Sequence, residues 1–465
     1  MGMAKLQLLL QLLFGTLLIV LQVSRGACDV SFGTADGTEE WGYVDVRQGA
    51  HLFWWLYYKD VSSPADVPLV LWLQGGPGAS GVGFGNFEEV GPLYTNLTER
   101  ESTWVKLVHL LFVDNPVGTG FSYVDEPSLL TTTNKQVSDD LAAFLKTFFS
   151  THEALKKSPF YIVAESYGGK FASEVGVAIF TNIEEGGLDF NFQGVALGDT
   201  WVSPTDFVLA WGPLLKSVSL VDEAGNDYLN SIAELAVEEL AKGHGTNSTF
   251  IWGDLEEAVL EITDNVDFYN FLKHESESDS SSSAGLKRKL GSRHLKRFAP
   301  DPLEIIMNGP IREKLSIIPS FVRWSESSGS VFQALASDFM LDTIDKVDEL
   351  LSLGVNVTIY SGQLDLICCT TGTEAWVQKL KWSGLASFNV AKRSPLYCGG
   401  DSQTQAFVKK YENLAFYWIL NAGHMVPTDN PCGALKLLSF VTKQGPRSES
   451  HIVRFTSDFQ NPLAT

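Results

Sequence analysis

The sequence is poor in cysteine, in positive charge and in long apolar runs, and each shortage excludes a class of protein. Five cysteines in 465 residues are too few for a disulfide framework, so a packed core must supply the stability. Lys and Arg number 34 against 55 Asp and Glu, a formal net charge of −21 that repels phosphate backbones and excludes nucleic acid as a partner. Beyond residue 26 no apolar run approaches the roughly 20 residues that span a bilayer.

The one pronounced apolar run lies at the N-terminus. Lys5 precedes a mostly apolar stretch over residues 6–21, and Ser24 and Gly26 place small residues at the two positions that determine cleavage. These features predict a signal peptide over residues 1–26, and no membrane association after its removal. Three sequons fit the same route and make candidate glycosylation sites of Asn96, Asn247 and Asn356. The odd cysteine count leaves a free thiol or a pairing between two chains open, and with it a homodimer.

What is present is a long globular chain, 45% hydrophobic. Apolar, β-prone runs alternate with helical patterns, which predicts an α/β fold with a mostly parallel sheet and helices on both faces. The expected hairpin spans 41–58, the expected strands are 69–73, 107–113, 159–163, 192–197, 355–360 and 414–420, and a helix is expected over 136–149. The predicted organisation is a first core part (27–203), an inserted helical cap (204–324), a second core part (325–443) and a polar tail (444–465). Within the cap, the serine-rich and charged segment 275–297 is predicted to be disordered, which leaves proteolytic processing open beside a plain surface loop.

One of these strands ends in a distinctive turn. The run from Pro159 reaches Ala164-Glu165-Ser166-Tyr167-Gly168, a small-x-Ser-x-Gly string. In a nucleophile elbow a buried strand turns sharply into a helix and exposes one hydroxyl, and small residues two places to either side let the two backbones approach. Taken alone, the string fits a plain glycine turn equally well, so its partners decide.

Those partners follow two later strands. A nucleophilic serine needs a base, and the base needs an acid that holds its tautomer. Asp365 comes shortly after strand 355–360 and His424 after strand 414–420. The order Ser166, Asp365, His424 is that of the α/β-hydrolase fold. In such open parallel sheets, ligands bind at the edge formed by the C-terminal ends of the strands. Asp365 could singly be a turn residue and His424 a core histidine, but together with Ser166 they predict a catalytic triad.

The tetrahedral intermediate also needs donors for its oxyanion. The Tyr167 amide, directly after the nucleophile, is one candidate. The second is Gly76, in the glycine-dense loop 74–81 that follows the buried strand 69–73.

Six segments together resemble the serine carboxypeptidases: LWLQGGPGAS, FEEVGP, FVDNPVGTGFSY, ESYGGK, YSGQLDLI and AGHMVP. The resemblance runs from about residue 41 to 443. It implies release of single residues from free peptide C-termini at acid pH, with no cofactor and no metal, in the lysosome or outside the cell. It places the triad and the oxyanion amides on the residues already named. It also implies that the terminal carboxylate of the substrate is bound by Gln74, the Gly75 amide, Glu89 and Glu165, where Gln74 stands in place of the usual asparagine.

That recognition sets two expectations about pH. Glu89 and Glu165 beside a third carboxylate must be protonated, so substrate affinity should weaken as the pH rises. A base that works in acid should have a depressed pKa, and we expect burial to lower that of His424.

Two other readings of the sequence remain. One is another acyl-transfer enzyme, such as an esterase or acyltransferase, or the hydroxynitrile lyase chemistry of some plant relatives. The other is a catalytically silent binding or scaffold protein on the same fold. Cys368 and Cys369 are expected to be buried structural residues rather than a bonded pair, because a disulfide between neighbours is strained.

Overall fold

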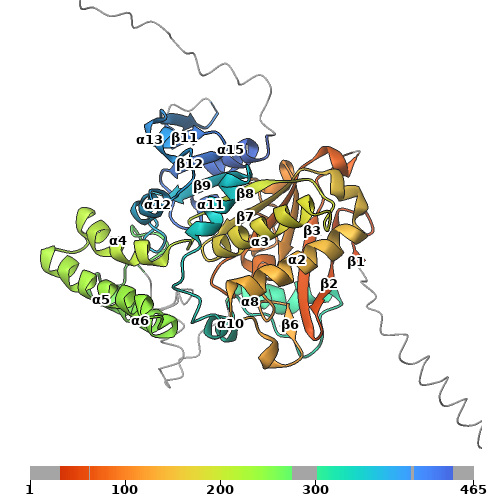
Figure 1. Ribbon diagram of the computed structural model, residues 1–465. Helices are drawn as coiled ribbons and strands as arrows, with labels where there is room; N and C mark the ends of the chain where they lie inside the picture. The colour runs from red at the N-terminus through yellow and green to blue at the C-terminus, as the bar shows by residue number, and fades with distance from the viewer. Residues whose placement is uncertain (1–31, 62, 275–300, 400–402, 444–465) are drawn as a thin grey trace, which may run out of the picture.

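A computed structural model describes residues 32–61, 63–274, 301–399 and 403–443. The predicted signal peptide, Cys28, the serine-rich segment 275–297 and the tail 444–465 lie outside these residues. Within them the chain forms a 12-stranded sheet in the order β1-β2-β3-β5-β4-β7-β8-β9-β12-β11-β10, with β6 paired to β3 (Figure 1). The six strands from β5 to β12 pair in parallel, and the strands at both edges pair antiparallel.

The strands match the apolar runs closely. Their bounds are β1 Phe32–Gly33, β2 Glu39–Arg47, β3 Ala50–Tyr57, β4 Leu69–Leu73, β5 His109–Val113, β6 Tyr123–Val124, β7 Phe160–Glu165, β8 Phe192–Gly198, β9 Asn356–Gly362, β10 Ser394–Tyr397, β11 Thr404–Tyr411 and β12 Leu414–Ile419. The parallel core with helices on both faces confirms the predicted α/β-hydrolase fold class. The edge strands β10 and β11 were not predicted.

Side chains of the central strands alternate between two cores. In β4, for example, Leu69, Leu71 and Leu73 pack into one core, and Val70 and Trp72 into the other. Because both faces are covered, such a strand is apolar at every position.

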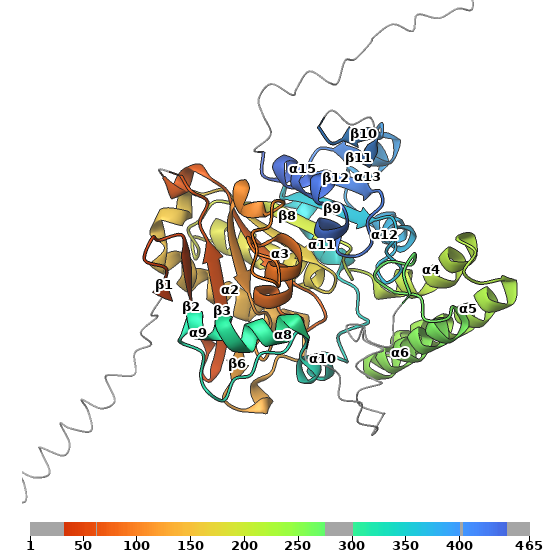
Figure 2. The ribbon, with the colours of Figure 1, turned by 180° about the vertical axis from the view of Figure 1, so that it is seen from behind.

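Helices cover both faces (Figures 1 and 2). Helices α2 (Asn134–Thr151), α3 (Gly168–Glu184) and α11 (Ile344–Ser352) pack over the first core. The π-helix η2 (Gly81–Val90), α8 (Pro302–Ile306), η6 (Met307–Ile311), α9 (Arg312–Leu315) and α15 (Pro431–Val441) contribute to the second. Outside the predicted cap segment the chain also forms the α-helices α10 Gly329–Ala334, α12 Thr370–Val377, α13 Leu385–Val390 and α14 Val426–Asp429, and the short 3-10 helices η1 Pro64–Asp66, η3 Trp104–Lys106, η4 Pro127–Leu129 and η5 Glu153–Lys157.

The predicted cap segment contains two groups of helices. Helices α4 (Pro204–Ser217), α5 (Glu223–Ala241) and α6 (Gly245–Ile262), green in Figure 1, extend away from the sheet. Helices α8 and α9 instead lie against the N-terminal half of the sheet (Figure 2). There Trp41 Nε1 donates to the Leu315 carbonyl at 2.9 Å. No helix among the described residues has the length and apolar content that crossing a membrane requires.

Candidate active site

The predicted elbow serine sits at the turn between β7 and α3. Ser166 has φ of 58°, a left-handed conformation that is strained for a serine. Its amide donates to the carbonyls of Gly198 and Asp199, each at 3.1 Å. A Cβ at Gly168 would lie 2.3 Å from the Leu73 carbonyl oxygen. The glycine is therefore required by the close approach of helix and strand.

The glycine loop after β4 passes directly over this turn. A Cβ at Gly75 would lie 2.5 Å from Cβ of Ser166 and 2.8 Å from the Tyr167 nitrogen. Gly76 has φ of 106°, which favours glycine. The amides of Gly75, Gly76 and Tyr167 donate no hydrogen bond within the part of the chain that the structure describes. Three free amides beside a serine hydroxyl are suited to bind anionic oxygen atoms.

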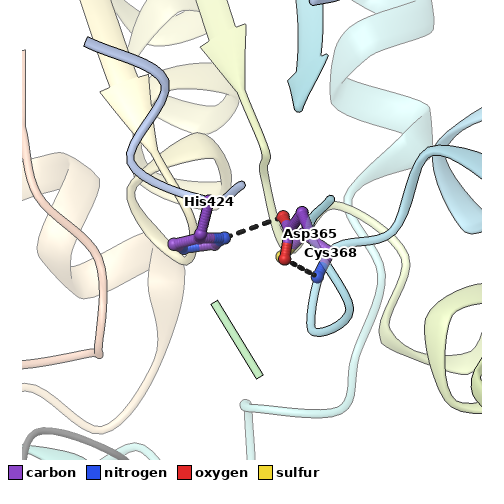
Figure 3. A group of neighbouring side chains, drawn as sticks. All are labelled: Asp365, Cys368 and His424. Carbon is purple, nitrogen blue, oxygen red and sulfur yellow. Dashed lines mark hydrogen bonds and ion pairs between the residues drawn. The ribbon is translucent and has the colours of Figure 1, made fainter. Parts of the chain in front are cut away.

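The predicted acid and base are in contact. Asp365 follows β9 and His424 follows β12, two strands that pair in parallel, so their ends share one sheet edge. His424 Nδ1 lies 2.8 Å from Asp365 Oδ2, and both side chains are buried (Figure 3). The other oxygen, Oδ1, accepts the Cys368 amide at 3.2 Å. Asp365 therefore fixes the imidazole with Nδ1 as the protonated nitrogen and leaves Nε2 as the nitrogen that can accept a proton.

The third contact of the predicted triad is not formed. No hydrogen bond joins the Ser166 hydroxyl to His424 among the described residues. Ser166 and His424 nevertheless lie at the same sheet edge, because Ser166 follows β7, His424 follows β12, and β7, β8, β9 and β12 pair in parallel. Catalytic hydrogen bonds are often long without substrate and shorten in the complex.

The expected pKa shift of His424 has the wrong sign. Burial does lower its pKa, but the negative charges of Asp365, Glu165 and Asp267, with the Asp365 hydrogen bond, together outweigh burial and raise it. The sequence identified the burial but did not show how many carboxylates surround the ring.

Two glutamates form a buried carboxyl pair at the same edge. Glu165 ends β7 and Glu89 lies on η2, a π-helix of the kind found frequently at functional sites. Both oxygens of Glu89 and Oε2 of Glu165 are buried without a hydrogen-bond partner among the described residues. Burial is the main cause that raises the pKa of each, and the charge of Glu165 adds to the rise at Glu89.

Gln74 connects this pair to the glycine loop. Its Nε2 donates to Glu165 Oε1 at 2.8 Å, and its Oε1 accepts Trp72 Nε1 at 2.6 Å. The four residues that the family resemblance assigned to carboxylate binding, Gln74, Gly75, Glu89 and Glu165, thus come from the loop after β4, from η2 and from β7, but meet beside Ser166.

Three supporting groups escaped the sequence analysis. The first is Arg100, which holds the end of η2 by donating to the backbone carbonyls of Phe87, Glu88 and Gly91. It also contributes a positive charge that partly offsets the rise in the pKa of Glu89.

The second group is a strap formed by residues 267–271, just after α6. The Phe268 carbonyl accepts the amides of Leu366 and Ile367 at 3.1 and 3.0 Å, in the loop of Asp365. The Tyr269 carbonyl accepts the His424 amide at 2.7 Å. Asp267 Oδ1 accepts the Tyr269 amide at 2.8 Å and so forms a local turn. The sequence could have indicated this turn, but not its contacts with the Asp365 loop and His424.

The third group lies under the elbow. Asp338 accepts Tyr167 Oη at 3.0 Å and Lys170 Nζ at 3.1 Å, and Lys170 Nζ lies 4.7 Å from the centre of the Tyr167 ring. Burial is the main cause that lowers the pKa of Lys170 to about 8. The network anchors the residue whose amide faces the serine. No local signal connects Lys170 with a partner 168 residues away.

One set of donor atoms resembles a metal site. Single atoms of Asp365, Cys368 and His424 lie within 4.8 Å of one another (Figure 3). However, His424 Nδ1 is bonded to Asp365. Burial raises the pKa of the Cys368 thiol well above its usual range, which disfavours the thiolate that a metal binds. The arrangement suits acid–base chemistry better than metal binding.

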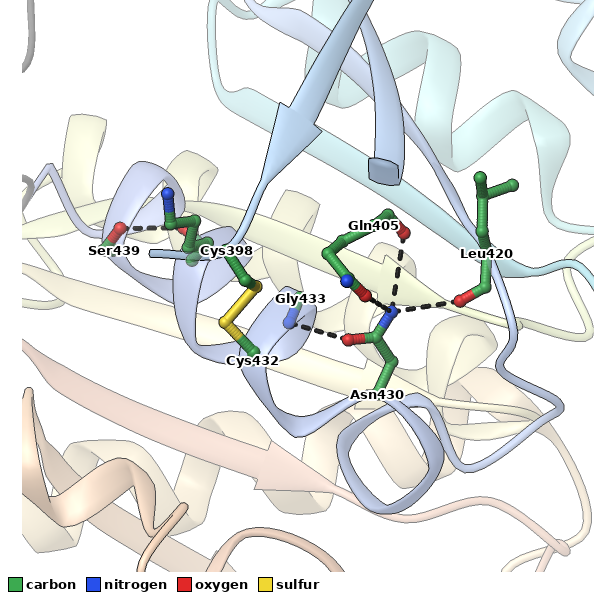
Figure 4. The surroundings of a disulfide bond; sticks show 8 residues. Cys398, Gln405, Leu420, Asn430, Cys432, Gly433 and Ser439 are labelled. Carbon is green, nitrogen blue, oxygen red and sulfur yellow. Dashed lines mark hydrogen bonds between the residues drawn. A yellow bond between two sulfur atoms is a disulfide. The ribbon is translucent and has the colours of Figure 1, made fainter. Parts of the chain in front are cut away.

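The remaining cysteines fall into two classes. Cys368 and Cys369 are free and buried, as expected. Cys398 and Cys432 form a disulfide that joins the region of β10 to α15 (Figure 4). Beside it Asn430 donates to the Leu420 carbonyl at 3.0 Å and accepts the Gly433 amide at 2.9 Å, which fixes the chain that follows His424.

The sequon asparagines differ in their surroundings. Asn96 lies in an exposed turn and Asn247 is exposed in the first turn of α6. Asn356 begins β9, is partly buried, and donates Nδ2 to the Gln193 carbonyl at 2.8 Å.

Comparison with known proteins identifies the family of the chain. A family profile described as serine carboxypeptidase matches residues 31–444. The retinoid-inducible serine carboxypeptidase of Mus musculus is 49% identical over 88% of this chain and 92% of its own length. Serine carboxypeptidase-like 51 of Arabidopsis thaliana is 47% identical over 88% and 93%. The crystal structure of Kex1, a prohormone-processing carboxypeptidase from Saccharomyces cerevisiae, superposes with a TM-score of 0.74 at 22% identity, over 87% of this chain and 91% of that one.

Proposed function

The chain belongs to the serine carboxypeptidase family of hydrolases, and on that premise we propose that Ser166, His424 and Asp365 release single residues from peptide C-termini in acid. The observation that carries the proposal is the juxtaposition of a bonded His424–Asp365 pair with an elbow serine and a buried carboxyl pair with unpartnered oxygens.

The proposed reaction proceeds through an acyl-enzyme. The Ser166 hydroxyl oxygen attacks the carbonyl carbon of the last peptide bond, and His424 Nε2 takes the hydroxyl proton. The resulting oxyanion accepts hydrogen bonds from the Gly76 and Tyr167 amides. The tetrahedral intermediate collapses, the C–N bond breaks, and the imidazolium returns its proton to the departing amino acid. Water, deprotonated by the same imidazole, then attacks the acyl-enzyme and frees Ser166.

The preference for a free C-terminus is assigned to Glu89 and Glu165, with Gln74 and the Gly75 amide. Buried acceptors without donors carry protons when their pKa values are raised. A protonated carboxyl group can donate to the carboxylate of the substrate, which two ionised glutamates would repel. The raised pKa values of both groups support this function in acid.

The decisive experiment measures residue release from N-blocked dipeptides between pH 4 and 8. The wild-type chain should act on a free C-terminus and lose most activity on the amidated peptide, and Ser166→Ala should be inactive on both. Equal turnover of free and amidated peptides would instead identify a less selective acyl-transfer enzyme. A fluorophosphonate probe provides the further control, because failure to label wild-type Ser166 would identify a silent scaffold.

The chain is also proposed to follow the secretory route, with residues 1–26 removed, to the lysosome or the exterior. Exposure of Asn96 and Asn247 supports glycan attachment at these two positions, whereas the Asn356 amide is already engaged. N-terminal sequencing and the mass lost on deglycosylation test the route and the sites. A homodimer remains a prediction, which sedimentation of the purified chain tests.

A further inference from the structure

A fourth side chain contacts the triad from the end of β8. Asp199 is buried, with φ of 43°, and follows Gly198 directly. Its carbonyl accepts the Ser166 amide at 3.1 Å, and its own amide donates to the Tyr360 carbonyl at 2.9 Å. Its Oδ1 accepts the Gly362 amide at 2.7 Å. One residue thus touches the backbone of the nucleophile and the strand that leads to Asp365.

Gly362 brings Asp199 close to Asp365, because its amide donates to Asp199 Oδ1 and its carbonyl accepts the Asp365 amide at 3.3 Å. The carboxyl group of Asp365 acts on the pKa of Asp199 both through its charge and through side-chain hydrogen bonding. Asp199 Oδ2 is buried and receives no N–H or O–H donor from the described residues. The oxygens of Asp365 already accept His424 Nδ1 and the Cys368 amide. The contact therefore joins two acceptor groups, and a single proton between them turns that repulsion into a hydrogen bond.

The charges around Asp199 favour that proton. The charges of Asp365 and Glu165 raise the pKa of Asp199, and the charge of Asp199 in turn raises the pKa values of Tyr360 and Cys368. None of these four neighbours is a cation. Burial first, and then the charge of Asp365, raise the pKa of Asp199 well above its usual range, whereas the Gly362 amide opposes the rise. A proton shared by the pair is therefore assigned to Asp199.

We propose that Asp199 is a positioning residue which, by donating a hydrogen bond to Asp365, weakens the attraction of Asp365 for a proton on His424 and keeps the imidazole basic in acid. The inference rests on the proposed function for its relevance, because only a triad that works in acid needs such a device. It addresses the contradiction noted above, in which the carboxylates around His424 favour its protonated form. A hydrogen bond to Asp365 spreads the charge of that carboxylate and so reduces its effect on the ring.

Two substitutions separate this role from packing. Asp199→Asn retains an acceptor for the Gly362 amide and an N–H donor for Asp365, and asparagine tolerates positive φ. We expect the acid limb of its kcat/KM profile, which reports the base of the free enzyme, to stay within about 0.3 pH units of wild type. Asp199→Ala removes the donor, so we expect the midpoint of the acid limb to shift to higher pH by about one pH unit. That shift would lower kcat/KM about tenfold at pH 4.5 and much less at pH 7.5.

The asparagine variant alone can overturn the proposal, even if the alanine variant fails to fold. If Asp199 were ionised in the native protein, Asp199→Asn would remove an anion beside the triad. The midpoint of the acid limb would then shift to lower pH by about one pH unit. An alanine variant that folds with the wild-type limb would overturn it too. The matched control is Asp140→Asn on α2, which breaks a partly buried ion pair with Arg47 of β2 (Nε to Oδ1, 2.6 Å). It should reduce stability and leave the limb in place.

Two readouts make the test independent of peptide hydrolysis. The pH dependence of the rate at which a fluorophosphonate labels Ser166 follows the same base. The His424 Nδ1 proton, assigned by its loss in His424→Gln, reports the titration directly in NMR spectra of the full chain. If wild type hydrolysed no peptide, the proposed function would fail, while the NMR titrations of wild type, Asp199→Asn and Asp199→Ala would still decide the role of Asp199.

Discussion

Two carboxyl pairs lie at one edge of the sheet, and they differ in what occupies their oxygens. In the pair of Glu89 and Glu165, three of the four oxygens are buried without a donor. In the pair of Asp199 and Asp365, the Gly362 amide, the Cys368 amide and His424 Nδ1 occupy three oxygens. Burial and like charge raise the pKa values of Glu89, Glu165 and Asp199. We call Glu89 and Glu165 the open pair, because their unoccupied oxygens can form hydrogen bonds with a ligand. We call Asp199 and Asp365 the filled pair, because their oxygens are mostly occupied, and the charge of this pair acts on His424.

The largest effect is expected from breaking the filled pair at Asp365. Asp365→Asn replaces the acceptor for His424 Nδ1–H and favours the wrong tautomer, so kcat should fall about 10⁴-fold. Asp199→Asn should change kcat less than about threefold at its optimum, because both of its hydrogen bonds survive. Steady-state kinetics on a blocked dipeptide, with circular dichroism to verify folding, measure both variants. Similar losses in the two would contradict the distinct roles of the pair members.

The role of the open pair is tested in two ways. Raising the pH removes the protons of Glu89 and Glu165, and substitution by glutamine replaces both side chains with donors that do not titrate. In wild type the substrate KM should rise with pH as the raised pKa values of Glu89 and Glu165 are passed. In the double variant Glu89→Gln and Glu165→Gln the donors remain, so KM at pH 7.5 should be about tenfold below wild type, about 1.4 kcal/mol of binding, and similar at pH 4.5.

Glu88→Gln is the matched control for this change. Glu88 is the neighbour of Glu89 on η2, but its Oε1 accepts Thr95 Oγ1 and it is only partly buried. Its KM profile should follow wild type. A steep alkaline rise of KM in the double variant would argue against recognition by protonated glutamates.

A third buried carboxyl sharpens the comparison, because it performs neither task. Asp114, after β5, accepts Ser80 Oγ, the Val82 amide and the Phe121 amide, and burial raises its pKa from 3.8 to about 6. A raised folded pKa stabilises the fold fully below the unfolded value and loses that contribution as the pH rises through the folded value. Between pH 4.5 and 6.5 this group should therefore lower the free energy of unfolding by about 2 kcal/mol.

Urea unfolding at three pH values in that window tests this sign. The raised pKa values of Glu89, Glu165 and Asp199 act in the same direction. Asp114→Asn should be less stable than wild type at pH 4.5 and show a shallower decline toward pH 6.5. A wild-type protein that gained stability over this range would refute the assignment.

The smallest effect is expected at the thiols beside the filled pair. Cys368 and Cys369 are buried, and burial raises their pKa values, that of Cys369 to about 11. Iodoacetamide at pH 7 should leave both unmodified in the native protein, with activity unchanged, and should modify both after unfolding. Mass spectrometry of native and denatured samples distinguishes the two states.

The sequence predicted the features that depend on neighbours in the chain. The run in β4 is apolar at every position because both faces of the strand are covered, and Gly168 marks the elbow because the turn itself brings helix and strand together. The fold class followed from the alternation of such runs. The strands β10 and β11 were missed because their burial alternates weakly at an exposed sheet edge.

The site was predictable in its residues but not in its electrostatics. Ser166, Asp365 and His424 could be named because each follows a recognisable strand. The sign of the pKa shift of His424 could not, because it is a sum over Asp365, Glu165 and Asp267, which come from three distant segments.

The sequence by itself thus determined the strands, the elbow and the identity of the reacting groups, since each is specified by spacing over a few residues. Only the tertiary structure decided which carboxyl groups lie beside one another, and which of their oxygens are left without a hydrogen-bond donor among the described residues. It brings together Asp199 and Asp365, and Glu89 and Glu165, from separate segments of the chain. The interactions of buried charges fall off over a few ångströms, and distance along the chain carries no information about them.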